Sequence, residues 1–173
     1  MATPNTTLVP LKEYLETSYR PDCDWIAGEL RERNAGEKPH LKVQGFLCFV
    51  FHGNQDRWGV EAFPEQRVQT SIDHYRIADL CVTVLAESDD PIVRTPPLLC
   101  VEILSRDDRM TEMQERVDDY LEMGVGTVWL IDPRRRKAFS TDSGGAMRSV
   151  ADTLKVPGAA IEISVAAIFA ELD

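Results

Sequence analysis

The chain has 173 residues, of which 43% are hydrophobic, and its formal net charge at pH 7 is −10. These values fit one globular domain with a sizeable core and exclude a disordered chain. The charge also opposes non-specific attraction to nucleic acid. No apolar run is long enough to cross a bilayer, and the opening MATPNTTLVP lacks the pattern of a secretion signal. We therefore expect a single domain over residues 1–173, in the cytoplasm and away from membranes.

The cysteines and histidines form no recognisable disulfide or metal pattern. The cysteines contain no C-x-x-C pair, and three of them lie in apolar runs, where a free thiol behaves as a small hydrophobe. No histidine stands at ligand spacing from a cysteine. A disulfide framework and a zinc site are therefore both disfavoured. The residues concerned are Cys23, Cys48, Cys81, Cys100, His40, His52 and His74.

The first part of the chain predicts short elements around one buried helix. Apolar side chains recur at helical spacing over residues 11–19, which predicts a short amphipathic helix. Residues 23–34, CDWIAGELRERN, alternate and turn at Gly28, which is typical of a strand or a short hairpin. The mostly apolar residues 40–53 favour a buried helix. Residues 59–70 favour a strand that its proline makes peripheral or bent.

The middle of the chain predicts a central sheet. Residues 77–85 and 98–104 are nearly apolar throughout, as expected for strands covered on both faces. A helical stripe follows, in which Thr111 and Gln114 resemble a capping box and a glycine ends the helix. The apolar segment 127–131 comes next. This strand–helix–strand order predicts a right-handed crossover that makes 98–104 and 127–131 parallel.

The end of the chain predicts smaller additions to this sheet. A weaker pair of strands is expected on either side of the DSGG turn at residues 142–145. Residues 161–172, IEISVAAIFAEL, predict a strand or turn that leads into a short helix. The whole pattern predicts a mixed α/β domain whose sheet is centred on the three apolar strands.

Two of these apolar strands each contain one carboxylate, Asp79 and Glu102. A buried carboxylate costs several kcal/mol unless it is paired, protonated or bound to a cation. On neighbouring strands in the right register the two would point to the same side, and a divalent cation with oxygen ligands would relieve their repulsion. Structural ion pairs explain them equally well, with Arg76 or Arg94 for Asp79 and an arginine of the following helix for Glu102.

Five segments occur in a familiar order between about residues 11 and 139: DCDWIAGEL, YRIADLCV, LLCVEILS, YLEMGV and TVWLIDP. Together they resemble the Uma family of restriction endonucleases, within the PD-(D/E)xK nuclease superfamily. The resemblance implies a restriction-endonuclease-like core of mixed α+β class, with a mixed central sheet flanked by helices. It also implies hydrolysis of nucleic-acid phosphodiester bonds, with DNA as the expected substrate and Mg²⁺ or Mn²⁺ as cofactor. A homodimer is expected, because many nucleases of this architecture act on two strands.

The resemblance assigns roles to residues of this chain. Asp79 matches the aspartate of the P-D motif and Glu102 the acidic residue of E-x-K, so both would bind the metal. The backbone carbonyl of Ile103 would be a third ligand. Asp24 matches an acidic residue near the G-E-L turn and would assist the metal, and Glu29 of that turn is a further candidate.

The chain departs from the superfamily pattern at the lysine. Leu104 stands where E-x-K has its lysine, and Ala78 replaces the proline of P-D. In Uma-like sequences the lysine lies on the next helix, four residues before a tyrosine, and here that position is Arg116, before Tyr120. Arginine can stabilise a phosphate but cannot transfer a proton at neutral pH. Gln114, on the other flank of the apolar stripe, would orient a water.

These departures leave two functions open, a metal-dependent endonuclease and a catalytically inactive binding or dimerisation module.

The basic run at residues 134–137, RRRK, could meet a phosphate backbone, although a solvated turn is favoured. The region 105–122 carries seven acidic residues and three arginines, so nucleic acid would have to approach from elsewhere.

Overall fold

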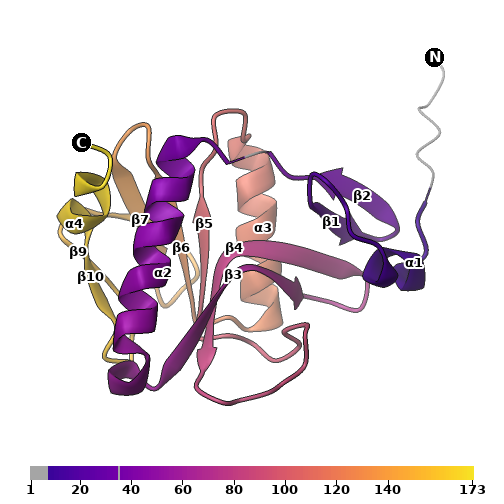
Figure 1. The fold of residues 1–173 in the computed structure, drawn as a ribbon, viewed down its shortest axis with the longest axis horizontal. Coiled ribbons are helices and arrows are strands. Elements are labelled where there is room, and N and C mark those ends of the chain that lie inside the picture. Colours follow the sequence, from indigo (N-terminus) through magenta and orange to yellow (C-terminus); the bar gives the residue numbers. More distant parts are fainter. Residues whose placement is uncertain (1–7, 35) are drawn as a thin grey trace.

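A computed structural model describes residues 8–34 and 36–173 as one mixed α+β body (Figure 1). The expected first residues of the domain, 1–7, lie outside the described part. The helices are α1 (Leu11–Glu16), α2 (Lys38–Trp58), α3 (Met110–Met123) and α4 (Val165–Ala170). The strands of the main sheet are β1 (Cys23–Ile26), β2 (Glu29–Glu32), β3 (Val60–Gln69), β4 (His74–Val84), β5 (Leu99–Ile103), β6 (Thr127–Asp132), β7 (Lys137–Thr141) and β8 (Met147–Val150). Two further strands, β9 (Thr153–Lys155) and β10 (Glu162–Ser164), pair with each other.

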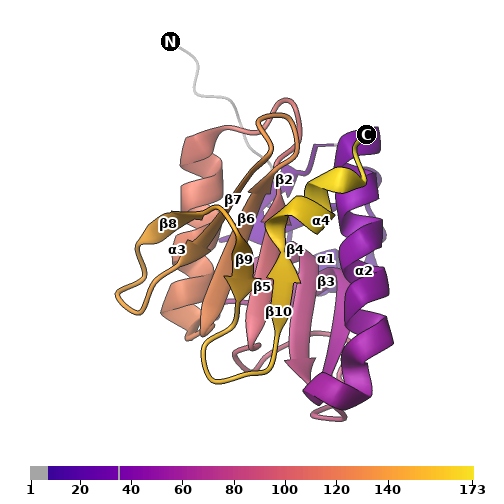
Figure 2. The same ribbon diagram turned by 90° about the vertical axis from the view of Figure 1, so that its left-hand side faces the viewer.

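The main sheet separates two layers of helices. In Figure 2, α2 and α4 cover one face and α3 covers the other. The larger buried cluster, on the α2 side, includes Leu47, Phe51 and Trp129. The smaller cluster packs Val117 and Tyr120 of α3 against the opposite face. Among the described residues, no helix combines the length and apolarity needed to span a bilayer.

The predicted parallel pairing of the strands on either side of the helix is confirmed. Strands β5 and β6 are parallel, with Leu99 opposite Thr127, and α3 connects them. Gly124 ends α3 in a left-handed conformation with a φ of 103°, as its lack of a side chain permits. The predicted capping box is wrong, because α3 begins after Arg109 and Thr111 already lies inside its first turn.

Most other elements follow the sequence prediction. The hairpin alternative for residues 23–34 is right, with a two-residue turn at Ala27 and Gly28, where φ is 49° and 93°. The strands around the DSGG turn and the final strand and helix are also present. The first helix is shorter than predicted, because Thr17 adopts an extended conformation and ends it at Glu16.

Strand β4 is shared by three partners, and this sharing creates an opening in the sheet. Along one edge β4 pairs with β3 almost throughout, from Tyr75 to Val84. Along the other edge it pairs with β1 at residues 74–75 and with β5 at residues 80–82. The backbone of residues 76–79 therefore has no neighbouring strand on that edge. Because buried backbone groups need partners, side chains must supply them here.

The side-chain alternation of β4 breaks at Asp79. Regular alternation would place Ile77, Asp79 and Cys81 on one face, but Ala78 and Cys81 lie in the same buried cluster. The β3–β4 ladder is continuous on both sides of this point and lacks the pair between Glu65 and Asp79, where Glu65 has a φ of 50°. Strict alternation is therefore wrong at this position, because the strand is locally distorted where its carboxylate stands.

Candidate active site

The opening beside β4 is filled by charged side chains that bond its backbone. The carboxylate of Asp24 accepts a hydrogen bond from the Ile77 N–H at 3.0 Å. Arg33 and Arg116 donate to the Ile77 carbonyl oxygen at 2.5 and 3.0 Å. At the break, Gln44 of α2 donates to the carbonyl oxygen of Asp79 at 2.9 Å. These bonds compensate for the missing strand and fix four polar groups around one point of the sheet.

Asp79 lies on β4, next to the residues that pair with β5, and is 2% exposed. Its Oδ2 accepts a hydrogen bond from the Ile103 N–H at 2.6 Å and lies 3.3 Å from Nε2 of His40, and its Oδ1 pairs with Arg33. Burial alone would raise the pKa of this carboxyl. The charge of Arg33 and the bonds from His40 and Ile103 outweigh burial and lower the pKa of Asp79 to about 2.

Glu102 faces α3, and it is 1% exposed. Its Oε2 lies 3.3 Å from Nε of Arg116, and its Oε1 accepts a hydrogen bond from the Tyr120 hydroxyl at 2.6 Å. Burial, together with the nearby charge of Asp79, raises the pKa of Glu102 to about 7, against the opposing effect of Arg116. The two central carboxylates therefore have opposite shifts, which is the pattern expected of a site with paired acidic groups.

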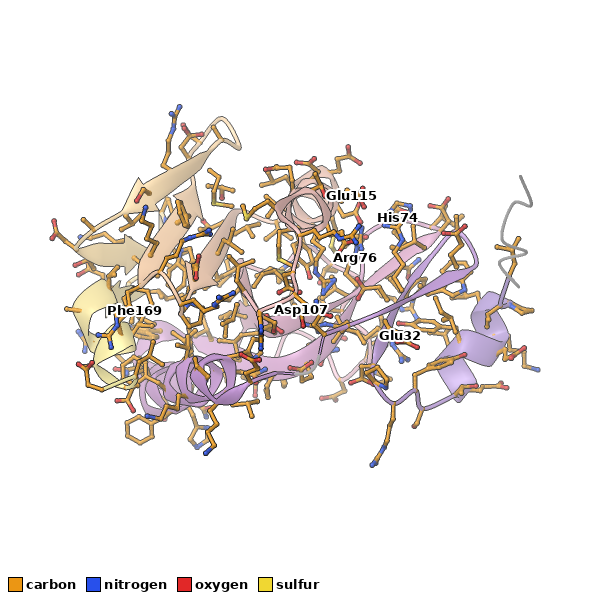
Figure 3. All side chains as sticks on the ribbon, turned by 90° about the horizontal axis from the view of Figure 1, so that it is seen from above. Glu32, His74, Arg76, Asp107, Glu115 and Phe169 are labelled. Atoms are coloured by element: carbon orange, nitrogen blue, oxygen red, sulfur yellow. The ribbon has the colours of Figure 1, made fainter. Side chains whose placement is uncertain are left out.

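Asp24 anchors the other side of the opening. Its Oδ2 pairs with Arg116 and lies 3.0 Å from NH1 of Arg76. Burial opposes ionisation here, but the arginines around Asp24 lower its pKa below the usual value. Arg76 is held in turn by Asp119 at 2.6 Å, which also contacts His74 at 3.2 Å. Figure 3 shows Arg76 and His74 next to α3.

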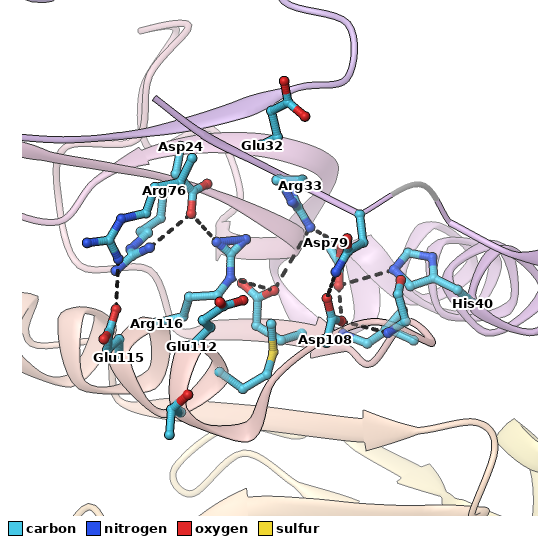
Figure 4. Close-up of a pocket in the computed structure, with 17 residues that line it drawn as sticks. Asp24, Glu32, Arg33, His40, Arg76, Asp79, Asp108, Glu112, Glu115 and Arg116 are labelled. Carbon is cyan, nitrogen blue, oxygen red and sulfur yellow. Dashed lines mark hydrogen bonds and ion pairs between the residues drawn. The ribbon is translucent and has the colours of Figure 1, made fainter. Parts of the chain in front are cut away.

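Five charged groups form one connected chain in this opening (Figure 4). Arg116 joins Asp24 to Glu102, and Arg33 pairs with Asp79 while its NH2 lies 4.0 Å from Glu102. They face a cavity of about 430 Å³. The cavity is lined by Asp24, Arg31, Glu32, Arg33, Asn34, His40, Arg76, Asp79, Glu102, Ile103, Ser105, Asp108, Thr111, Glu112, Met113, Glu115 and Arg116. An open polar cavity over two perturbed carboxylates has the form of an active site.

Comparisons with known proteins agree with this geometry. The family whose description reads "Putative restriction endonuclease", Uma2, matches residues 11–155. The chain belongs to the Uma2 family. A crystal structure from Anabaena variabilis, titled as a "putative nuclease belonging to DUF820", superposes with a TM-score of 0.83 at 22% identity, over 95% of this chain and 99% of that one. A search of curated proteins found no match. The predicted family and fold are therefore confirmed, and together they support a nuclease.

The structure brings most of the predicted site residues of this Uma2-family chain together. Asp24, Asp79, Glu102, Ile103 and Arg116 all line the cavity. The ion-pair alternative also describes Glu102 correctly, because its partner is an arginine of α3. For Asp79 that alternative named the wrong arginines, since Arg76 pairs with Asp24 and Asp119, and Arg94 with Asp90.

Gln114 does not belong to the site. It is exposed, does not line the cavity, and donates to Asp118 on the same helix at 2.8 Å. The structure does not bring it to the cavity, because a position two residues before Arg116 turns its side chain away from the sheet. Glu29 also lies away from the cavity, paired with Ile26 across the hairpin turn.

Sequence reasoning missed two side chains that contact Asp79 through nitrogen atoms, Arg33 and His40. Arg33 follows the end of β2 and His40 lies in the first turn of α2, yet both reach Asp79. Burial opposes the charged ring, but the hydrogen bond and charge of Asp79 raise the pKa of His40. The sequence offered only one indication of these residues, the short spacing between the hairpin and the first turn of the next helix. This spacing does not show which carboxylate they contact until the fold is known.

The donor set fits a hard divalent cation better than a zinc ion. In the parts of the chain that the structure describes, no group of three or more His, Cys, Asp or Glu side chains is arranged to hold a metal. Magnesium commonly takes only one or two carboxylates and completes its shell with water and phosphate oxygens. Asp79 and Glu102 supply two such carboxylates beside an open cavity, and the raised pKa of Glu102 is the shift that a nearby cation would reverse.

Proposed function

We propose that this protein is a Mg²⁺- or Mn²⁺-dependent endonuclease that hydrolyses phosphodiester bonds in nucleic acid, with DNA as substrate, and that it acts as a homodimer. The observation that carries the proposal is the pair of buried carboxylates, Asp79 and Glu102, at the opening of the sheet in a chain of the Uma2 family. Two acidic groups in a buried strand region are costly unless a cationic ligand or partner stabilises them.

Asp79, Glu102 and the carbonyl of Ile103 would hold the metal. When bound, the metal would neutralise charge on the phosphate and lower the pKa of a water that attacks it. The protein's own contribution is positioning. The Ile103 N–H holds Asp79 at 2.6 Å, and Tyr120 and Arg116 hold Glu102 at 2.6 and 3.3 Å. Arg116 thus acts as a positioning residue, because each of its three guanidinium nitrogens donates to a protein acceptor.

A second cavity supports a substrate that carries phosphates. It has a volume of about 370 Å³ and shares Ser105 and Asp108 with the first cavity. Three arginines line it, Arg106, Arg134 and Arg135, and all three are exposed. In a chain with a net charge of −10, a group of arginines beside the site gives nucleic acid a local place to bind.

Arg33 is the group that a metal would have to displace. Its guanidinium pairs with Asp79 and approaches Glu102, so it already supplies positive charge between the two carboxylates. The residue follows β2 and is partly exposed, at 15%. Displaced from Asp79, it would face the cavity, where a planar guanidinium suits a phosphate.

We therefore expect Arg33→Met to strengthen manganese binding by about tenfold, because the competing ion pair is lost. The same variant should cleave nucleic acid more slowly than the natural protein. Calorimetry measures the first effect and a cleavage assay the second. Arg31→Met is the matched control, since Arg31 pairs with Glu115 at 2.8 Å at the exposed rim of the cavity. Unchanged or weaker manganese binding in Arg33→Met would contradict this role.

One observation favours a second function, a catalytically inactive binding module. Three arginines, Arg33, Arg76 and Arg116, already pair with the buried carboxylates, so the charges are compensated without a metal. A nuclease fold that has lost its metal would look the same. The two functions differ in whether the protein binds a divalent cation.

Manganese titration of the metal-free protein by calorimetry decides between them. We expect saturable binding that Asp79→Ala abolishes, and metal-dependent cleavage of DNA that disappears in the same variant. Asp79→Asn is the second variant, because its amide oxygen can still accept the Ile103 N–H and so preserve the fold. Asp107→Ala is the control, an exposed acidic residue outside the cavity. Absence of binding at millimolar manganese would leave the binding module as the function.

A further inference from the structure

The outer face of α2 presents an exposed aromatic side chain. Phe49 is 77% exposed, the largest exposure of any aromatic residue in the described part of the chain. Figure 2 shows α2 at the outer edge of the molecule, with its other side against the sheet. Buried residues of the same helix, including Val43, Leu47 and Phe51, occupy the opposite face. The helix is therefore amphipathic except for an apolar group on its solvent side.

Glycines lie on both sides of Phe49 along this face. Gly45 precedes it by four residues and Gly53 follows it by four, so all three share one side of the helix. A side chain added at either glycine would meet nothing within 4 Å. No packing inside the chain therefore requires glycine here, although glycine is the least favourable helix residue after proline. The missing side chains of the two glycines leave space on both sides of the Phe49 ring. That space would let a second helix approach this face closely.

Charges at the two ends of this face are complementary. Lys42 lies seven residues before Phe49 and Asp56 seven residues after it, and both are exposed. Among residues 8–34 and 36–173, neither forms an ion pair. Two antiparallel copies of α2 that cross at Phe49 would place Lys42 of each copy opposite Asp56 of the other. The same crossing would place the ring over the glycines of the partner copy.

We propose that two copies of this chain associate through α2, antiparallel and centred on Phe49, with a two-fold axis at the crossing. Residues at equal distances before and after Phe49 match: glycine stands four positions away on each side, and opposite charges stand seven positions away. An isologous contact, in which the same surface of both copies meets, requires such a match. The exposed Leu41 would lie opposite Arg57 of the second copy, whose methylene groups can cover it. A contact with a different protein would not need this symmetry. The inference rests on the homodimer of the proposed function but not on its nuclease chemistry, since it uses no residue of the cavity.

Sedimentation equilibrium on the full chain tests the association. We expect the natural protein to be a dimer at micromolar concentrations and Phe49→Ala to be a monomer with unchanged circular dichroism. Lys42→Asp and Asp56→Lys should each weaken the dimer at least tenfold, because like charges then face each other. The double variant Lys42→Asp/Asp56→Lys should recover the dimer, a result that a nonspecific effect of charge would not give.

A second measurement separates a failed interface from a failed fold. Gly53→Leu replaces a poor helix former with a good one at an open position, so we expect a higher Tm together with loss of the dimer. Ile72→Ala is the control, an exposed apolar residue on the loop between β3 and β4. A natural protein that stays monomeric at 100 μM (on the order of a weak dimer's Kd), or a dimer that persists in Phe49→Ala, would overturn the inference.

Discussion

Replacement of Arg116 by methionine should destabilise the metal-free protein by about 3–5 kcal/mol. Arg116 is 5% exposed and bonds Asp24, Glu102 and the carbonyl oxygen of Ile77. Methionine has similar length but no donor, so it would leave two buried carboxylates short of a partner. A whole domain is typically stable by only about 5–15 kcal/mol, so the effect would be a large fraction of the total.

Urea denaturation in the presence of a chelator measures this change. Arg31→Met is the matched control, because that arginine also pairs with a carboxylate, that of Glu115, but its side chain is 43% exposed. Such exposed pairs contribute at most about 1 kcal/mol. The double variant Arg116→Met/Glu102→Gln should recover part of the loss, since one of the stranded charges is then gone. A loss below 1 kcal/mol for Arg116→Met would mean that water already solvates the carboxylates.

The cost of a buried charge was visible in the sequence, and it located the centre of the site. Asp79 and Glu102 interrupt otherwise apolar strands, and the structure places both beside the same cavity. The strand order followed from apolar runs and helical spacing, which are local patterns. Arg116 was found by resemblance, through its position four residues before Tyr120.

The partners of these carboxylates depend on long-range geometry that local patterns do not contain. Arg33 reaches Asp79 across 46 positions of sequence, and Gln44 reaches its carbonyl across 35. The Arg33 contact is possible because β1 and β5 share one edge of β4 and leave residues 76–79 without a strand partner on that edge. Gln44 reaches Asp79 where the β3–β4 ladder lacks a pair. The break in side-chain alternation at Asp79 lies at this missing pair of the β3–β4 ladder. Alternation is a property of a regular ladder, and the site lies where the ladder is irregular.

The stability of the metal-free protein should fall as the pH rises from about 4.5 to above 7, because of Glu102. The folded protein holds a proton on this carboxyl with a pKa of about 7, whereas the ordinary value is 4.5. The contribution of Glu102 to the free energy of unfolding is therefore fully present below pH 4.5. It is lost as the pH rises through 7, by up to about 3 kcal/mol in all. Asp79 acts in a separate range, since its lowered pKa of about 2 causes loss only as the pH falls below about 4.

Urea denaturation at pH 5, 6, 7 and 8 (values spaced about one unit apart, across the interval between the two pKa values of Glu102) would show this slope, and Glu102→Gln should remove most of it. The amide of that variant keeps an oxygen for Tyr120 and has no proton to lose. His40 contributes with the same sign but only above pH 6.5, because its pKa is raised in the folded protein, so His40→Gln identifies that part. A slope between pH 5 and 6.5 that survives in Glu102→Gln would mean that Glu102 is already ionised beside Arg116, and that the arginines alone compensate the charges of the site.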